Sequence, residues 1–187
     1  MKLVKIYTDG GCSGNQSRTN LGGWGAILEF GPHLKELWGA EANTTNNRME
    51  LTAVIEAFKA LKEDELTVEV YSDSSYVTNC FREKWYESWE QNKWRNAAKK
   101  SVENQDLWKE LLELVRKHNV TFYRVKGHVK LPEAAEGRLP QNAALDKLYD
   151  KFVQTNGARF SYEDFIYIIK MNNIVDGLAN KGIDSIR

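Results

Sequence analysis

The stretch TTNNRMEL, residues 44–51, introduces an amphipathic helix and places Glu50 near its start. Apolar residues recur after it at helical spacing, which predicts a helix over about 47–62. These residues are Leu51, Val54, Ile55, Phe58 and Leu61. We therefore expect Glu50 in the first turn of this helix.

Two other carboxylates, Asp9 and Asp73, follow apolar runs that are typical of strands, over 3–8 and 66–72. In an open α/β sheet, ligands gather beyond the carboxyl ends of parallel strands, so we expect Asp9 and Asp73 to be neighbours. Clustered carboxylates repel one another unless cations neutralise them. Hard oxygen ligands of this kind suit Mg²⁺ or Mn²⁺ rather than zinc.

Each of these carboxylates also has a plain structural interpretation. Asn47 and Glu50 have the spacing of a capping box, and the TDGG that contains Asp9 is a good turn sequence. An Asp after a strand is often only a turn residue. The occurrence of all three acids in this order favours a site.

Six segments of the chain, taken together, resemble type 1 ribonuclease H, which cuts the RNA of RNA–DNA hybrids. They are YTDGGCSGN, TTNNRMEL, YSDSSYV, a Trp-rich segment ending in NQDLW, VKGHV and NNIVDGLAN. The resemblance covers residues 1–128 and resumes at about residue 172. It implies a four-carboxylate site formed by Asp9, Glu50, Asp73 and Asp176, with His128 on a mobile loop.

The resemblance also implies the chemistry. Hydrolysis of a phosphodiester needs an activated water and a stabilised phosphorus centre, and two Mg²⁺ ions on bridging carboxylates supply both, with Mn²⁺ as an alternative ion. The expected products carry a 3′-hydroxyl and a 5′-phosphate. His128 suits proton transfer or product departure, although a lone histidine in a loop is usually only a surface residue.

Recognition of RNA depends on contacts to the 2′-hydroxyl in the minor groove, made by small and polar groups. The resemblance assigns contacts with the hybrid to Gly10, Gly11, Cys12, Gly14, Asn15, Thr45, Asn46, Asn47, Ser74 and Ser75. Each of these residues alone has a turn or cap interpretation. Ser75 stands where the family commonly has Gln, so that contact is expected to be shorter or water-mediated.

Residues 81–104 resemble the basic handle with which the family grips the DNA strand. The contacts that the resemblance assigns to this handle are Trp85, Lys93, Trp94, Arg95, Lys99, Lys100 and Asn104. Trp85 and Trp89 are four residues apart, so we expect at least these two to pack against each other within a helix pair. Acidic residues interrupt the basic ones, which predicts weaker hybrid binding than in the most basic relatives.

Strands followed by alternating helix and strand predict a mixed sheet, and the resemblance implies an α/β, ribonuclease H-like fold in which a mixed five-stranded sheet is flanked by helices. A Gly-rich loop is expected after residue 8, a hairpin over 22–40, and a last strand over 120–125. Helices are expected from about residue 74 and along Leu107, Leu111, Leu114 and Val115. We expect residues 1–187 to form one ribonuclease H domain.

Residues 130–171 depart from the family pattern, and their apolar spacing predicts a helical insertion, such as a pair of helices, before the last helix. The insertion offers Asp146, Asp150 and Asp164 as rivals to Asp176 for the fourth carboxylate. We favour Asp176, because Asn172 and Asn173 precede it as candidate caps and would place it in a first helical turn. The role of the insertion is not indicated.

Composition adds few constraints. The 187 residues fit one domain, and the formal net charge is zero, so any attraction to phosphate must come from local patches. Two cysteines, Cys12 and Cys80, indicate free thiols in a reducing compartment. With no signal peptide or membrane-spanning run, we expect a cytoplasmic enzyme that acts as a monomer on an RNA–DNA hybrid. The alternatives are a catalytically silent hybrid-binding module and a DNA nuclease of the same fold.

Overall fold

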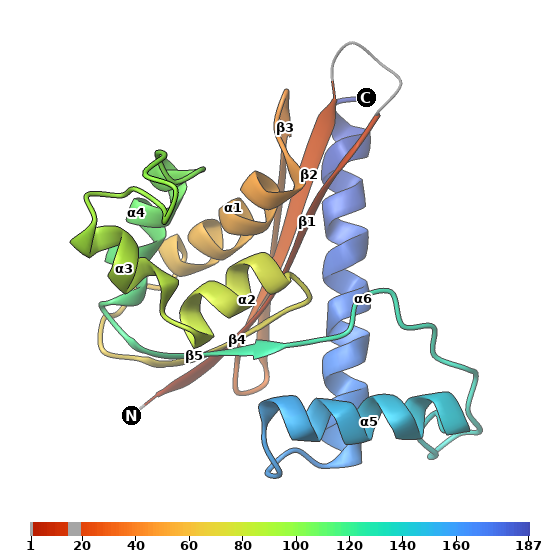
Figure 1. Ribbon diagram of the computed structural model, residues 1–187. Coiled ribbons are helices and arrows are strands. Elements are labelled where there is room, and N and C mark those ends of the chain that lie inside the picture. The colour runs from red at the N-terminus through yellow and green to blue at the C-terminus, as the bar shows by residue number, and fades with distance from the viewer. Residues whose placement is uncertain (1, 15–19) are drawn as a thin grey trace.

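The computed structural model describes residues 2–14 and 20–187, and its centre is a five-stranded sheet (Figure 1). The strand order is β3-β2-β1-β4-β5. The strands are β1 (Leu3–Ser13), β2 (Leu21–Phe30), β3 (His33–Ala42), β4 (Thr67–Ser72) and β5 (Asn119–Arg124). β1, β2 and β3 pair antiparallel, whereas β4 is parallel to both β1 and β5. The expected mixed sheet of five strands is confirmed.

Helices cover both faces of the sheet (Figure 1). They are α1 (Asn46–Lys59), α2 (Ser75–Arg82), α3 (Trp85–Gln91), α4 (Gln105–Val115), α5 (Ala143–Asn156) and α6 (Tyr162–Ser185). One buried cluster joins α1, α2 and α4 to the sheet, and a second joins α5 and α6 to its other face. Within the described residues, no helix combines the length and apolar character needed to cross a bilayer.

β1 is longer than expected. The Gly-rich residues 10–13 were expected in a loop, but they continue the strand, and Gly10 to Ser13 pair with β2. The small side chains allow this, because Gly10 passes so close to α1 that an added Cβ would lie 2.4 Å from the carbonyl carbon of Met49. The parallel pairing of β1 with β4 still ends at Thr8 and Ser72, directly before Asp9 and Asp73.

The start of α1 also differs from the expectation. The cap is Thr45, whose backbone is extended (φ −129°, ψ 161°) and whose Oγ1 accepts a hydrogen bond from the N–H of Arg48 at 3.1 Å. Asn47 is already helical, so the capping box expected between Asn47 and Glu50 does not form. Glu50 lies one turn into the helix rather than in its first turn, and its side chain is buried.

The insertion is helical before the last helix, as predicted, because α5 lies within it, but the second helix of the expected pair is not a separate one. Its second apolar segment is the beginning of α6, a single helix that continues through Asp176 to Ser185. α6 begins at a true capping box between Ser161 and Asp164, and Asn172 and Asn173 lie in its middle. Buried residues recur at helical spacing from Phe165 to Ile183, so nothing in the packing ends the helix at 172.

Glycines on β2 bring α6 close to the sheet. A Cβ added at Gly25 would lie 2.7 Å from the carbonyl oxygen of Val175, and one added at Gly23 would lie 2.0 Å from that of Ala179. Side chains at these two positions would therefore push α6 away. This close approach sets the height of Asp176 above the strands.

Candidate active site

Three carboxylates meet where the parallel pairing of β1 and β4 ends. Asp9 continues β1, Asp73 follows β4, and Glu50 reaches them from α1. Each offers an oxygen such that these three oxygens lie within 4.8 Å of one another. The sequence prediction that Asp9 and Asp73 are neighbours is confirmed, and Glu50 joins them because Gly10 lets β1 run against the first turns of α1.

Asp176 completes the acidic group from the opposite side. It extends from α6 into the same open cavity of about 560 Å³ that Asp9, Glu50 and Asp73 line, and its proximity raises the pKa of Asp9. The rivals in the insertion lie elsewhere, since Asp146 and Asp150 are exposed on α5 and Asp164 caps α6. The structure thus brings Asp176 to the cluster from mid-helix rather than from a first turn.

Burial and mutual repulsion disfavour the ionised forms of these acids. Burial, then the charge of Asp73 and contact with Asp176, raises the pKa of Asp9 to about 8. Burial, followed by the charges of Asp9 and Asp73, raises the pKa of Glu50 well above its usual value, and burial raises that of Asp73. Glu50 Oε2 is buried without a hydrogen-bond partner among the described residues. A cluster of carboxylate oxygens that repel one another in this way fits a divalent cation, which would neutralise their charges.

His128 lies on the rim of the cavity, after β5. Its backbone has a positive φ of 57°, and the preceding Gly127 approaches Asp73 so closely that an added Cβ would lie 2.4 Å from Asp73 Oδ2. The Nδ2 of Asn173 donates to the carbonyl of Val129 at 3.0 Å, which ties this loop to α6. The exposed imidazole therefore stands beside the acids without being buried among them.

Asn172 is a functional residue that sequence reasoning missed. It was interpreted as a helix cap, but its side chain is buried, and its amide favours the ionised form of Asp73, which lowers the pKa of that acid against the effect of burial. The available signal was its spacing, because Asn172 lies four residues before Asp176 and so shares its face of a helix.

The predicted substrate contacts separate into two groups. Gly10, Gly11, Cys12 and Asn46 line the cavity, and Asn46 Oδ1 accepts the Cys12 N–H at 2.7 Å. The other predicted contacts that the structure describes do not line this cavity. Thr45 and Ser74 cap α1 and α2, Ser75 opens α2, Asn47 and Gly14 are exposed, and Asn15 falls outside the described residues.

Comparison with known proteins agrees with this geometry. A family model described as RNase H matches residues 1–153. The chain belongs to the ribonuclease H family. Proteins named ribonuclease H from Chlorobium luteolum and Syntrophomonas wolfei are 58% and 55% identical to it over 131 and 128 residues. These alignments cover 70% and 68% of this chain and 87% and 86% of the relatives.

Solved ribonucleases H share the fold. The LC9-RNase H1 structure, described as a type 1 RNase H with the type 2 active-site motif, is 29% identical with a TM-score of 0.61, covering 88% of this chain and 80% of that one. LC11-RNase H1 in complex with an RNA/DNA hybrid has 17% identity and a TM-score of 0.57, covering 98% of each chain, and supports the fold alone. The protein is thus a type 1 ribonuclease H, a hydrolytic endoribonuclease of a metal-dependent family.

The family match ends inside α5, so Asp176 lies beyond the matched residues. Its place in this ribonuclease H site rests on the geometry of α6, which brings Asp176 into the cavity that Asp9, Glu50 and Asp73 line. The insertion therefore lengthens the connection to the fourth carboxylate without displacing it from the cluster.

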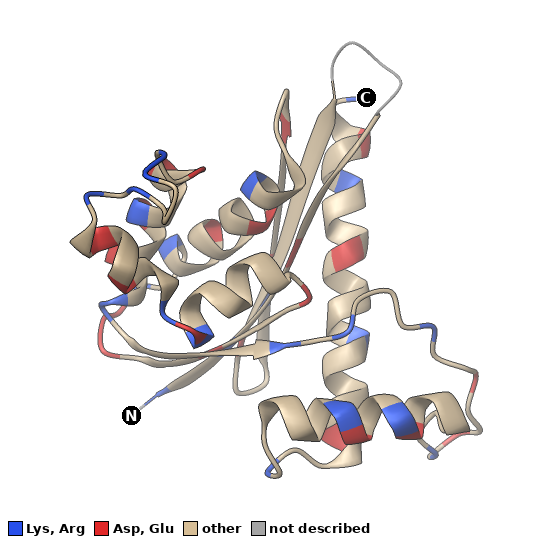
Figure 2. Ribbon diagram, in the orientation of Figure 1, with Lys and Arg blue, Asp and Glu red and all other residues tan. Residues whose placement is uncertain are grey.

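The basic handle expected in this ribonuclease H lies around α3 and the loop that follows it, where Figure 2 shows Lys and Arg gathered between α3 and α4. The expected packing of Trp85 against Trp89 is wrong. Trp89 packs against Trp94 and Trp108, with ring centroids 5.9 and 5.5 Å away, and Trp85 is 38% exposed. The reason is that α3 is short and the chain turns back, so that the N–H of Trp94 donates to the carbonyl of Trp89 at 2.6 Å.

The other handle residues are set apart from the catalytic cavity. Lys93, Lys99 and Lys100 are exposed, and the guanidinium of Arg95 donates to the carbonyl of Lys99 at 3.1 Å. Trp94 is half-buried, and the ammonium of Lys109 lies 5.3 Å from the centre of its ring. These residues form a surface separate from the acids.

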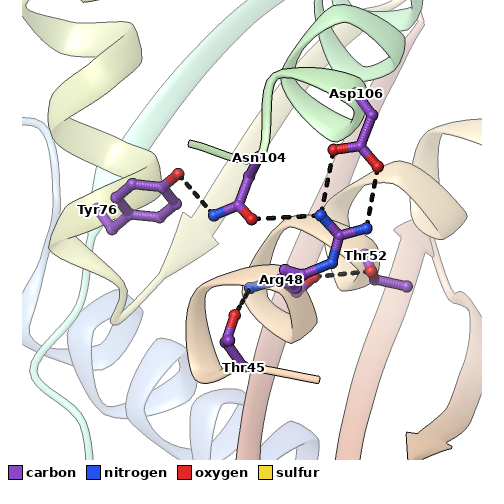
Figure 3. A network of polar contacts seen from close by, with 6 residues as sticks. All are labelled: Thr45, Arg48, Thr52, Tyr76, Asn104 and Asp106. Carbon is purple, nitrogen blue, oxygen red and sulfur yellow. Dashed lines mark hydrogen bonds and ion pairs between the residues drawn. The ribbon is translucent and has the colours of Figure 1, made fainter. Parts of the chain in front are cut away.

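A polar network joins the handle to α1 (Figure 3). Arg48 Nη1 donates to Asn104 Oδ1 at 3.2 Å, and Asn104 Nδ2 donates to the Tyr76 hydroxyl at 3.2 Å. The same hydroxyl accepts the indole N–H of Trp108 at 2.8 Å. Asn104, assigned to the hybrid by resemblance, is thus engaged within the protein, and Arg48 is a second residue that sequence reasoning missed.

Proposed function

We propose that the protein hydrolyses the RNA strand of RNA–DNA hybrids endonucleolytically, leaving 3′-hydroxyl and 5′-phosphate ends. The observation that carries this is the convergence of Asp9, Glu50, Asp73 and Asp176 on one open cavity in a chain of the ribonuclease H family. Support for the substrate comes from the relatives named ribonuclease H.

The four carboxylates would hold two Mg²⁺ ions, with Mn²⁺ as an alternative. The donor set fits, because it consists of hard oxygens, its ionisation is disfavoured without cations, and Glu50 Oε2 is buried without a partner among the described residues. When bound, such ions activate a water and stabilise the charge that develops on phosphate.

The protein side chains have distinct tasks in this proposal. Asn172, which is buried on α6 four residues before Asp176, favours the ionised form of Asp73 that would hold a cation. Asp9 and Glu50 are held by the close crossing of β1 and α1. His128, exposed on the rim, can accept or deliver a proton at the scissile phosphate without holding a cation.

Recognition of the hybrid would begin at the cavity wall formed by Gly10, Gly11, Cys12 and Asn46. Small residues let a sugar edge approach the backbone. The Nδ2 of Asn46 can donate a hydrogen bond to the hybrid while its Oδ1 accepts one from the N–H of Cys12. The exposed lysines of the handle supply phosphate contacts farther along the duplex. We also propose that the chain acts as a single monomeric domain.

Incubation of the protein with RNA–DNA hybrid, duplex DNA and duplex RNA, each with and without Mg²⁺, tests the proposal. We expect cleavage only of the hybrid and only with the ion. Cleavage of duplex DNA would favour a DNA nuclease of the same fold, and hybrid binding without cleavage would favour a silent binding module. Either result would reject the proposed activity.

A further inference from the structure

A second groove opens beside the catalytic cavity, between the end of β5 and α5. Its volume is about 370 Å³, and it shares Asp73, Lys126 and Gly127 with the catalytic cavity. The floor is apolar and is made by Val125, Leu148, Phe152 and Phe165. We call this hollow the α5 groove.

Three cationic side chains line the α5 groove. Arg124 ends β5, Lys126 follows it, and Lys151 faces them from α5. In Figure 2, Lys and Arg positions lie at the end of β5 and along α5, where Asp positions lie beside them. In the part of the chain that the structure describes, none of these three side chains forms an ion pair. The nearby Arg159, by contrast, is paired with Glu69.

The cations in the groove have no role inside the fold. All three residues are exposed, and Arg124 contacts Asn156 only through its backbone, which donates to Asn156 Oδ1 and accepts from its Nδ2. In a chain with no net charge, unpaired cations gathered in one groove attract an anionic ligand. The shared wall places that ligand next to Asp73.

We propose that the α5 groove binds backbone phosphates of the hybrid next to the cleavage site, so that the insertion extends the substrate track. This inference rests on the proposed function, because the hybrid is the polyanion that enters the adjoining cavity. Lysine and arginine side chains that face a phosphate backbone position a duplex without reading its sequence. In Figure 1, α5 lies across the molecule from α3 and α4, so the two basic surfaces would hold different parts of the duplex.

The test compares two double variants of the intact protein. Arg124→Gln with Lys151→Gln removes two groove cations and leaves Lys126, which also lines the catalytic cavity. Arg138→Gln with Lys147→Gln is the matched control, because it removes one Arg and one Lys from exposed positions of the same insertion, outside the groove lining. Hybrid affinity is measured by fluorescence anisotropy over a range of salt concentrations, with a chelator present to prevent cleavage.

We expect the groove variant to bind more weakly, with the slope of log affinity against log salt shallower by about 1 to 2, since each lost phosphate contact removes about 0.9 from a duplex slope. The control variant should keep the wild-type slope. An unchanged slope in the groove variant, or an equal change in both variants, would overturn the inference. Melting temperatures of both should match the wild type, because the replaced side chains are exposed.

The proposed function and this inference fail separately. If the wild-type protein does not cleave hybrid with Mg²⁺, the proposed function is wrong. If the wild type cleaves hybrid and the groove variant binds it with an unaltered salt slope, the function stands and only the role of the α5 groove is rejected.

Discussion

Arg48 and Asp106 form a bidentate ion pair, in which Nη1 of Arg48 lies 3.1 Å from Oδ1 of Asp106 and Nη2 lies 3.0 Å from Oδ2 (Figure 3). The pair joins α1, which carries Glu50, to the start of α4, where the handle ends. The Asp106 side chain is 65% exposed, so solvent screens the attraction and the pair adds little to stability. Its main consequence is geometric, because it fixes the handle relative to the acids.

Replacing Arg48 with Met should therefore weaken binding of the hybrid more than it slows the cleavage step. We expect KM for the hybrid to rise while kcat stays near the wild-type value, with stability reduced by about 1 kcal/mol or less. Lys59→Met is the control, since Lys59 also links α1 to α4, through Glu110 at 2.9 Å, but at the far end of α1. Steady-state kinetics check this, and an equal rise of KM in both variants would argue against a positioning role.

The fourth carboxylate can be tested by a pair of substitutions. Asp176→Asn should cripple cleavage and weaken metal affinity, because Asp176 lines the cavity and contacts Asp9. Asp146→Asn should do neither, because Asp146 is exposed on α5. Calorimetric titration with Mg²⁺ and hybrid cleavage provide the two readouts. The reverse pattern would move the fourth ligand into the insertion.

Asp9 should make the metal-free protein less stable as the pH rises. Its pKa is about 8 in the fold against an ordinary 3.8, so between these values the folded chain holds a proton that the unfolded chain has released. The contribution of Asp9 to the free energy of unfolding is therefore fully present below about pH 4 and is lost by about pH 8. Thermal melts in chelator should show this decline, and Asp9→Asn should reduce it. An undiminished decline in Asp9→Asn would show that other groups cause it.

His128→Ala should retain measurable activity. A side chain that assists proton transfer contributes about 10² to 10⁴-fold, and His128 stands on the rim rather than among the acids. Single-turnover cleavage of hybrid measures the loss. Complete inactivity with an unchanged melting temperature would instead indicate that His128 holds a metal ion or an essential part of the loop.

The sequence was informative where local pattern determines structure. Apolar runs located the strands, and helical spacing located the helices. The position of Asp9 and Asp73 after two of these apolar runs correctly placed the two carboxylates together. The Gly-rich residues 10–13 were assigned to a loop because glycine is typical of turns. Their extended conformation depends on pairing with β2 and on the close passage of α1, which are tertiary contacts.

The second half of the chain was predicted less well for the same reason. Two consecutive Asn residues look like a cap, and although the spacing of Asn172 from Asp176 places both on one helix face, only the fold shows that this face lies beside Asp73. The Arg48 network likewise joins residues that lie far apart along the chain. Likewise, only the fold shows that Lys151 faces Arg124 across a groove.

The most direct test of the central claim is cleavage of a hybrid whose two strands carry different labels, by the wild type and by Asp73→Asn, with Mg²⁺. The account predicts that the wild type cuts only the RNA strand, and that turnover falls by at least about a thousandfold in the variant, because one of the carboxylates that would hold the ions is lost. Near-normal turnover of Asp73→Asn, or cutting of the DNA strand by the wild type, would contradict it.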